Sequence, residues 1–413
     1  MTRRPRERRP RGRSRVGERF EAEVGPVAHG GHCVVRLPEP ESRVVFTRHT
    51  LPGERVVLEI TEGTEGDSFW RADAVEVLEP SADRVVPPCP WAGPGRCGGC
   101  DLQHASLPAQ RALKTAVVRE QLARLAGLEV DVEVDPVPGD DDGLGWRTRV
   151  QWAVDDDGRA GLRRHRSHEV VPVDHCRIAH PGVDAAGVTE RSWPGVASVE
   201  VAVSTTQGGT LVLPEGRGSG ALTETVGGHD FRVSGGGFWQ VHPGAARTLL
   251  DVVLDGLEPR AGDTALDLYG GVGLFAASLA DRVGPTGRVT CIEADRVAVE
   301  DARHNLAGLP QVRVERGRVD HVLRRLHLRA ADVVVLDPPR SGAGKAVVDL
   351  LSRVGARRIA YVACDPAALA RDLRWFGERG YRLDSIRAFD LFPMTHHVEC
   401  VAVLAPTGGR GIR

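Results

Sequence analysis

A single cysteine stands where an α/β fold would place its chemistry. Cys364 follows an apolar run at 359–363, which predicts a buried strand, and precedes a helix-like segment that begins near Ala367. Ligands of open α/β sheets bind beyond the carboxyl ends of the strands, so Cys364 would lie at such an end. A thiolate in that position can act as a nucleophile. The alternative is that Cys364 is a small buried hydrophobic residue.

Four further cysteines indicate a metal site. Cys89, Cys97 and Cys100 lie on one Gly/Pro-rich loop, and Cys176 is the best candidate for a fourth ligand. Four thiolates suit zinc or an iron–sulfur cluster. Their spacing differs from the two Cys-x2-Cys pairs of a zinc ribbon, so it does not select the metal. Free reduced cysteines are the alternative.

A glycine-rich turn predicts a nucleotide site. The segment Asp267-Leu268-Tyr269-Gly270-Gly271-Val272-Gly273 follows a predicted strand, and Glu293 closes the next one. Glycines let a ligand approach the backbone closely, and an acid at this place suits paired ribose hydroxyls. Dinucleotides and S-adenosylmethionine (SAM) both fit such a turn.

Two features favour SAM over a dinucleotide. Asp267 ends the first strand, and Asp337-Pro338-Pro339-Arg340 ends the fourth. An Asp/Asn-Pro-Pro motif after strand four is typical of methyltransferases that act on a planar nitrogenous base. An ordinary strand-terminating turn is the alternative for the two prolines.

Strands and helices alternate from residue 263 onward, which predicts a parallel, doubly wound sheet. The last two strands have no helix between them and predict an antiparallel pair at the sheet edge. The expected strands are 264–269, 289–293, 312–315, 332–337, 358–363, 381–389 and 397–404, with helices near 297–308, 319–329, 345–354 and 367–379.

Short β-type runs precede the cysteines and predict a small barrel of the OB type, which commonly binds oligonucleotides. A purely structural barrel is the alternative. The runs are 19–24, 32–36, 43–46, 54–60 and 72–78. After the cysteine loop, Ser106 is expected to cap a helix that runs to about Ala126.

Two segments of the following region, 129–235, could contact RNA. Residues 146–152 interleave arginines with two tryptophans, which suits phosphate contact and base stacking. Residues 162–168 add further positive charge. A solvated strand face is the alternative for both.

The composition is that of a globular protein with two or three domains: 413 residues, 41% hydrophobic and 27% charged. The net charge of −2 conceals eight arginines and one glutamate in the first fifteen residues, a tail expected to be disordered. With no export signal and no long apolar stretch, we expect a cytoplasmic monomer without a membrane segment. The expected parts are a basic tail (1–16), the barrel (17–78), a mixed α+β central domain with the cysteines (79–235), the SAM-binding domain (236–406) and a short tail (407–413).

In combination, several motifs resemble the TRAM-bearing 5-methyluridine RNA methyltransferases, and the likeness covers about 17 to 405. The motifs are Phe238-Trp239-Gln240-Val241, Asp267-Leu268-Tyr269, Asp337-Pro338-Pro339-Arg340, Tyr361-Val362-Ala363-Cys364-Asp365-Pro366 and Phe392-Pro393-Met394-Thr395-His396-His397-Val398-Glu399. The resemblance implies SAM-dependent methylation of uracil C5 in ribosomal or transfer RNA, and the cysteine set favours ribosomal RNA.

The resemblance also implies roles for individual residues. Cys364 matches the nucleophile and Glu399 the general base. The cofactor contacts would be Gln240, Tyr269, Glu293 and Asp320, together with the glycine turn and with Asp337 at the junction of cofactor and base. The four ligands of a 4Fe–4S cluster, or of zinc as the alternative, would be Cys89, Cys97, Cys100 and Cys176.

The sequence departs from the family's pattern in three places. The first cysteine pair is two residues wider than expected, and Gly270 and Leu274 replace the Cys and Asn often found in the SAM loop. Asp365 stands where Asn usually follows the nucleophile. A carboxylate there would raise the pKa of the Cys364 thiol, and the amino end of the following helix would oppose that effect.

Two other classes of function compete. A non-catalytic RNA-binding or assembly factor would have no need for both Cys364 and Glu399. A nicotinamide-dependent oxidoreductase is permitted by Gly271-x-Gly273-x-x-Ala276, but it leaves the Asp-Pro-Pro motif unexplained. We therefore expect an RNA (uracil-C5) methyltransferase.

Overall fold

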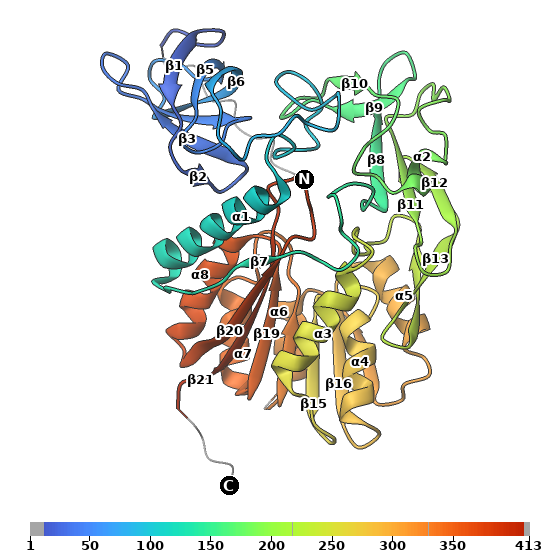
Figure 1. The fold of residues 1–413 in the computed structure, drawn as a ribbon. Coiled ribbons are helices and arrows are strands. Elements are labelled where there is room, and N and C mark those ends of the chain that lie inside the picture. Colours follow the sequence, from blue (N-terminus) through green and yellow to red (C-terminus); the bar gives the residue numbers. More distant parts are fainter. Residues whose placement is uncertain (1–11, 217, 329, 409–413) are drawn as a thin grey trace.

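The N-terminal part of the chain is a six-stranded barrel-like sheet (Figure 1). The structure, a computed structural model, describes residues 12–216, 218–328 and 330–408. All five predicted strands are present, and the two-residue strand β2 was not predicted. Along β5 every second residue is buried, as a strand with one face on a core requires. The strands are β1 (Arg19–Glu23), β2 (Val27–Ala28), β3 (His32–Arg36), β4 (Val44–Arg48), β5 (Arg55–Glu62) and β6 (Phe69–Glu79).

The basic tail predicted for residues 1–16 lies mostly outside the described residues. The part that is described rests on the barrel, where Ser14 forms a bridge with Thr64 and Arg15 pairs with Glu18 and Glu41. The end of the predicted C-terminal tail, 409–413, is also outside the described residues.

The central part holds a five-stranded antiparallel sheet in the order β10-β9-β8-β11-β12 and a separate hairpin, β13–β14. These elements are β8 (Arg149–Val154), β9 (Ala160–Arg163), β10 (Val170–Pro172), helix α2 (Pro181–Asp184), β11 (Ser198–Val203), β12 (Thr210–Pro214), β13 (Ala221–Val226) and β14 (His229–Ser234). The tryptophans predicted to stack on bases are buried instead: Trp146 is 5% exposed and Trp152 is 1% exposed. The stacking prediction for 146–152 is therefore wrong, because both indoles belong to apolar cores.

The C-terminal part is an eight-stranded sheet in the order β17-β16-β15-β18-β19-β21-β20-β7, with helices on both faces (Figure 1). The first five strands of that order are parallel, and β21 and β20 follow as an antiparallel pair. The prediction that this pair forms the edge of the sheet is wrong, because β7 adds beside β20 as the edge strand. The strands are β7 (Val134–Asp135), β15 (Thr264–Leu268), β16 (Arg288–Glu293), β17 (Val312–Arg316), β18 (Val333–Leu336), β19 (Arg358–Ala363), β20 (Tyr381–Phe389) and β21 (Glu399–Pro406).

Two apolar cores cover the two faces of this sheet. One core contains residues of α3, α4 and α5, and the other contains residues of α1, α6, α7 and α8. This is the doubly wound arrangement that the strand–helix alternation predicts. Helix α3 was not predicted, although its buried leucines and valines recur with helical spacing. The helices are α3 (Ala245–Leu257), α4 (Leu274–Val283), α5 (Arg296–Asn305), α6 (Val319–Leu326), α7 (Lys345–Val354) and α8 (Pro366–Gly377).

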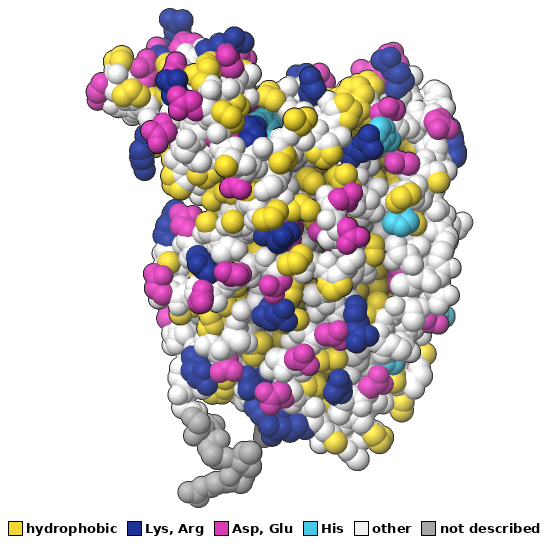
Figure 2. Space-filling model, viewed as in Figure 1, with side chains coloured by type: hydrophobic (Ala, Val, Ile, Leu, Met, Phe, Trp, Pro, Cys, Tyr) yellow, Lys and Arg dark blue, Asp and Glu magenta, His cyan; other side chains and the backbone are white. Residues whose placement is uncertain are grey.

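Helix α1 (Leu107–Gln121) joins the central part to the C-terminal sheet. Ser106 caps it as predicted, since its side chain accepts a hydrogen bond from the Ala109 amide. A π-helical turn (Leu122–Ala126) continues it to Gly127, which ends the helix in the left-handed conformation at φ +67°. Within the described residues, no helix is both long and apolar enough to cross a membrane. On the face drawn in Figure 2, cationic and anionic side chains are interspersed.

A buried ion pair fixes α1 to the sheet. Lys114 Nζ lies 2.5 Å from Asp390 Oδ1 and 3.1 Å from the Phe392 carbonyl oxygen, and both charged side chains are almost fully buried. Burial lowers the pKa of Lys114, and the Asp390 carboxylate opposes that shift. The pair therefore holds the amino end of the loop that leads to β21.

Replacing Lys114 with methionine is expected to lower the free energy of unfolding by about 3–5 kcal/mol, because it leaves Asp390 buried without its cation. Urea unfolding followed by circular dichroism measures the change. The double variant Lys114→Met/Asp390→Leu should recover most of the loss, since it removes both charges. A single variant as stable as the parent would contradict this expectation.

Candidate active site

Cys364 and Glu399 are brought together by strand register. Cys364 directly follows β19, and Glu399 begins β21, which runs antiparallel beside it. The last pair of that ladder is Ala363 with Cys400. Extending the register by one residue places Glu399 opposite Cys364, and neighbouring strands lie about 5 Å apart. Two residues 35 positions apart in the sequence thus meet at the carboxyl end of β19.

Charges around the Cys364 thiol act in both directions. Burial, then the carboxylates of Glu399 and Asp337, raise its pKa to about 11, and the Arg340 guanidinium opposes them. Glu399 is 4% exposed, and burial followed by the Asp337 charge holds its pKa well above the usual range. Desolvation likewise raises the pKa of Asp337 to about 7. Arg340 belongs to the Asp-Pro-Pro motif, but the sequence alone did not indicate its effect on both groups.

The Asp365 carboxylate is engaged by two partners. Its Oδ1 accepts a hydrogen bond from the Ala368 amide, so Asp365 caps helix α8. Its Oδ2 lies 3.2 Å from Nε2 of His29, which belongs to the N-terminal barrel. Burial opposes ionisation of Asp365, but the bonds from His29 and Ala368 outweigh it and lower its pKa. The carboxylate next to the thiol is therefore not an isolated charge.

Polar anchors hold the loop that leads into Glu399. Asp101, next to Cys100, accepts hydrogen bonds from the His396 amide (3.1 Å) and pairs with Nδ1 of its ring (2.6 Å). Gln110 of α1 accepts a bond from the Met394 amide at 2.8 Å. The cysteine loop and α1 thus position the segment before Glu399. No local pattern in the sequence indicates these contacts.

The glycine-rich turn lies at the carboxyl end of β15, as predicted. Asp267 is 1% exposed; its Oδ2 accepts the Ala276 amide of α4, whereas its Oδ1 has no hydrogen-bond partner among the described residues. Burial raises the pKa of Asp267 to about 7. Glu293 ends β16 and accepts the Gly271 amide at 3.0 Å. Gly273, the residue before α4, has φ +98°, a conformation that favours glycine.

Gly270 has a steric reason in this chain. A Cβ at this position would lie 2.4 Å from the Cys291 sulfur on β16 and 3.0 Å from Asp267 Oδ2. A side chain at 270 is therefore incompatible with the buried Cys291. The Cys291 sulfur on the neighbouring strand therefore occupies the space that a side chain at position 270 would need.

The remaining predicted cofactor residues differ in whether their polar groups already have partners within the protein. Gln240 and the Tyr269 hydroxyl make no side-chain hydrogen bond to another described residue and could each accept a ligand. Burial, then the charge of Asp320, raises the pKa of Tyr269 to about 12. Asp320 lies in the first turn of α6 and pairs with Arg318 and Arg324. Its carboxylate is thus already partly used by cations.

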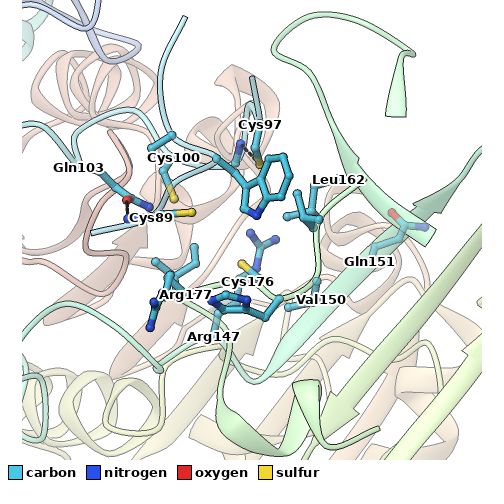
Figure 3. Close-up of a pocket in the computed structure, with 16 residues that line it drawn as sticks. Cys89, Cys97, Cys100, Gln103, Arg147, Val150, Gln151, Leu162, Cys176 and Arg177 are labelled. Carbon is cyan, nitrogen blue, oxygen red and sulfur yellow. Dashed lines mark hydrogen bonds between the residues drawn. The ribbon is translucent and has the colours of Figure 1, made fainter. Parts of the chain in front are cut away.

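The four predicted ligand cysteines line one cavity of about 50 Å³ (Figure 3). Cys89, Cys97 and Cys100 enter it from the Gly/Pro-rich loop, and Cys176 lies across from them. The thiols are not disulfide-bonded, and burial is the main cause that raises the pKa of the Cys176 thiol to about 11. Across the described ranges, no three Cys, His, Asp or Glu side chains are placed closely enough to hold a metal ion.

Comparison with known proteins identifies the family. The TRAM domain profile matches residues 13–72, that of the methyltransferase small domain 245–357, and that of tRNA (uracil-5-)-methyltransferase 321–406. An uncharacterised RNA methyltransferase of Streptomyces coelicolor is 56% identical over 95% of this chain and 94% of its own length. One of Streptomyces avermitilis is 54% identical over 95% of this chain and 99% of its own length.

The chain belongs to the TRAM-domain uracil-5 RNA methyltransferase family. It is thus a SAM-dependent RNA methyltransferase, and its barrel is a TRAM domain. The tRNA (uracil-54, C5)-methyltransferase of Pyrococcus abyssi, solved with S-adenosyl-L-homocysteine, has the same fold: its TM-score is 0.69 at 23% identity, over 92% of this chain and 99% of that one.

The glycine turn fits the family's cofactor. The unpartnered, buried Asp267 Oδ1 and the free polar groups of Gln240 and Tyr269 are donors and acceptors that a bound SAM could satisfy. Asp267, Tyr269, Gly271, Gly273 and Glu293 lie at or near the carboxyl ends of β15 and β16. Their contacts with SAM stay a prediction.

Proposed function

We propose that this enzyme methylates C5 of uridine in RNA through a covalent enzyme–RNA intermediate. The observation that supports the proposal is the register of β19 and β21: continued by one residue, it brings the Cys364 thiol beside the buried Glu399 carboxyl at the carboxyl end of β19. An RNA-binding factor without catalysis would need neither group there.

The proposed reaction begins at C6 of the base. The Cys364 thiolate attacks C6, and the electron pair moves through the ring to make C5 nucleophilic. SAM supplies the electrophilic methyl group. After C5 has taken the methyl, the Glu399 carboxylate removes the C5 proton, and the electrons of that C–H bond expel the Cys364 sulfur. The products are the methylated base, S-adenosyl-L-homocysteine and the enzyme, in which Cys364 is free again and Glu399 carries the C5 proton.

The environment of Glu399 suits its step, whereas the raised pKa of the Cys364 thiol works against the thiolate that the first step needs. Its raised pKa makes the Glu399 carboxylate a stronger base than an ordinary glutamate. Arg340 favours the charged forms of both Glu399 and Cys364. Asp337 lies between the cofactor turn and the thiol in strand order, where it can face both SAM and the base.

RNA must present an unstacked uridine, since a stacked base cannot reach the thiol; flipping costs a few kcal/mol. A cavity of about 420 Å³ between the TRAM domain and the cysteine loop is a candidate place for flanking nucleotides, with Arg84, Arg96, His49 and His104 in its walls. We propose ribosomal RNA as the substrate class and a monomer as the active form. The substrate class is tested by offering ribosomal and transfer RNA transcripts as methyl acceptors and comparing how much methyl group each receives.

Trapping with 5-fluorouridine RNA tests the proposed function. Fluorine at C5 cannot leave as a proton, so protein, SAM and this RNA should yield a covalent adduct on a denaturing gel. Cys364→Ala should give none. Cys400→Ala, which removes the neighbouring buried thiol, should still give the adduct. No adduct from the parent protein, despite bound SAM, would favour a non-catalytic RNA-binding role.

We further propose that Cys89, Cys97, Cys100 and Cys176 hold a 4Fe–4S cluster, with zinc as the alternative. The support is that all four line one cavity, although no three of the described side chains stand closely enough together in this structure to share one ion. Because Asp101 ties this loop to the segment before Glu399, the metal would act as a clamp. Methyl transfer needs no electron from it.

Replacing Cys176 with alanine is expected to remove most of the bound metal, because a three-thiolate set holds either group less well. Elemental analysis of iron, sulfide and zinc measures the content and separates the two metals. Cys33→Ala, in the TRAM core, is the matched control and should retain the metal. Equal metal content in both variants would contradict the assignment.

A further inference from the structure

The β2–β3 turn of the TRAM domain touches both loops that carry the proposed catalytic residues. The turn consists of His29, Gly30 and Gly31. His29 pairs with Asp365, the residue after Cys364. Gly31, at φ +77°, packs so closely that a Cβ there would lie 2.7 Å from the Cβ of His396, three residues before Glu399. An RNA-binding domain thus reaches into the catalytic centre.

The Asp365 side chain links this turn to the nucleophile. One carboxylate oxygen caps α8 through the Ala368 amide, and the other faces His29 Nε2 at 3.2 Å. The two contacts fix the carboxylate from opposite sides. Since the Cys364 and Asp365 backbones are continuous, the same contacts restrict the turn that aims the Cys364 sulfur.

The environment of the pair favours the charged imidazolium form of His29. The hydrogen bond with Asp365 raises the pKa of His29 against the effect of burial, and the charges of Asp365 and of Glu120 on α1 act in the same direction. His32, the other histidine near this turn, is uncharged at neutral pH because burial lowers its pKa to about 4. Because the pKa of His29 is raised, the stabilisation from its ion pair with Asp365 is fully present below pH 6.5. This stabilisation is lost as the pH rises through the raised pKa.

We propose that His29 is a positioning residue for methyl transfer, which holds the Asp365 turn, and with it Cys364, in place from the TRAM domain. The inference rests on the proposed function, because it assumes that Cys364 is the nucleophile. It implies that docking of the TRAM domain and reactivity of the thiol are linked. A misplacement of a reacting group by as little as about 1 Å can cost on the order of 100-fold in rate.

A double-mutant cycle tests the inference. The rate of adduct formation is measured in single turnover, at saturating SAM and 5-fluorouridine RNA, for His29→Gln, Asp365→Asn and the double variant. His29→Gln is expected to slow the reaction about 10-fold. In the Asp365→Asn background the same change should cost no more than about 2-fold, since its ionic partner is gone. SAM affinity should stay unchanged in all three.

His229→Gln is the matched control. His229 forms a pair of the same chemistry with Asp281 at 2.7 Å, between the β13–β14 hairpin and α4. It lies outside the contact of the TRAM domain with the catalytic centre, so its removal should leave the rate unchanged.

The pH dependence separates positioning from a general loss of structure. The deficit of His29→Gln should be largest below pH 6.5 and should shrink as the pH rises through the raised pKa of His29, because the parent then also loses the imidazolium charge. A deficit that is the same at every pH, or that persists in the Asp365→Asn background, would overturn the inference. So would a His29→Gln variant as fast as the parent. Absence of any adduct from the parent instead removes the proposed function, and this inference with it.

Discussion

Replacing Cys364 with alanine is expected to lower the single-turnover rate of RNA methylation at least about 1,000-fold. Without the sulfur no bond can form to C6, and C5 of uracil remains a poor nucleophile toward the methyl group. Transfer of labelled methyl from SAM into RNA measures the rate. The thiol lies at a strand end, where its removal leaves the sheet core intact, so the loss should be one of chemistry.

Two measurements test whether the loss in Cys364→Ala is one of chemistry and not of cofactor binding or folding. Cys364→Ala should bind SAM with the parent's affinity, because none of the proposed cofactor residues lies on β19 or in the turn that carries Cys364. Cys400→Ala changes an adjacent thiol that is fully buried and should retain most of the activity. Methylation by Cys364→Ala at even a tenth of the parent rate would exclude the covalent mechanism.

Replacing Glu399 with glutamine is expected to slow turnover by about 100- to 10,000-fold, the usual contribution of a positioned acid–base group. Because the amide cannot accept the C5 proton, the reaction should stop after methyl transfer. A covalent complex of protein with ordinary, unfluorinated RNA should then accumulate and should carry the labelled methyl group. Denaturing gels with labelled SAM detect both features at once.

The control for Glu399→Gln is Glu300→Gln. Glu300 lies on the exposed side of α5, where it pairs with Arg296. This variant should turn over normally and accumulate no complex. If Glu399→Gln loses activity without any methylated adduct, Glu399 acts before methyl transfer and the assigned role is wrong.

Lowering the pH should act on the parent as the Glu399 variant does. Burial and the Asp337 charge raise the Glu399 pKa, so this carboxyl is protonated at a higher pH than an ordinary glutamate. A protonated carboxyl cannot take the C5 proton. We therefore expect the release of methylated RNA to slow as the pH falls through the raised pKa of Glu399, measured by quenching a preformed complex at each pH. A release rate independent of pH would contradict this.

Much of the catalytic domain could be read from local patterns. Apolar runs bounded by glycine and proline predict strands, and residues at the carboxyl ends of parallel strands share one edge. Asp267, Glu293, Asp337 and Cys364 are therefore predictable as neighbours without coordinates. The cap at Ser106 and the end of its helix at Gly127 are local signals too, and both were correct.

Failures came where burial depends on distant partners. The sequence pattern of residues 146–152 is the same whether their tryptophans face RNA or a core. The alternation of residue types shows which side chains share a face of the strand, but it does not show what covers that face. Trp152 packs in the core of the central sheet, and Trp146 lies with Ile178 and Met394. Strand β7 contributes only two residues, too few for a periodic pattern.

Local periodicity and motif spacing, which depend on neighbouring residues alone, were sufficient for the fold class and for placing the glycine-rich turn and Cys364 at the carboxyl ends of their strands. The roles of these residues in cofactor binding and catalysis stay predictions. Three contacts required the packed chain: Glu399 opposite Cys364, Asp101 on His396, and His29 on Asp365. Each joins elements whose meeting depends on strand order and on how the TRAM domain, the cysteine loop and the sheet pack together. Such contacts form only when the apolar faces of all three parts are buried at once, and no short stretch of sequence records that outcome.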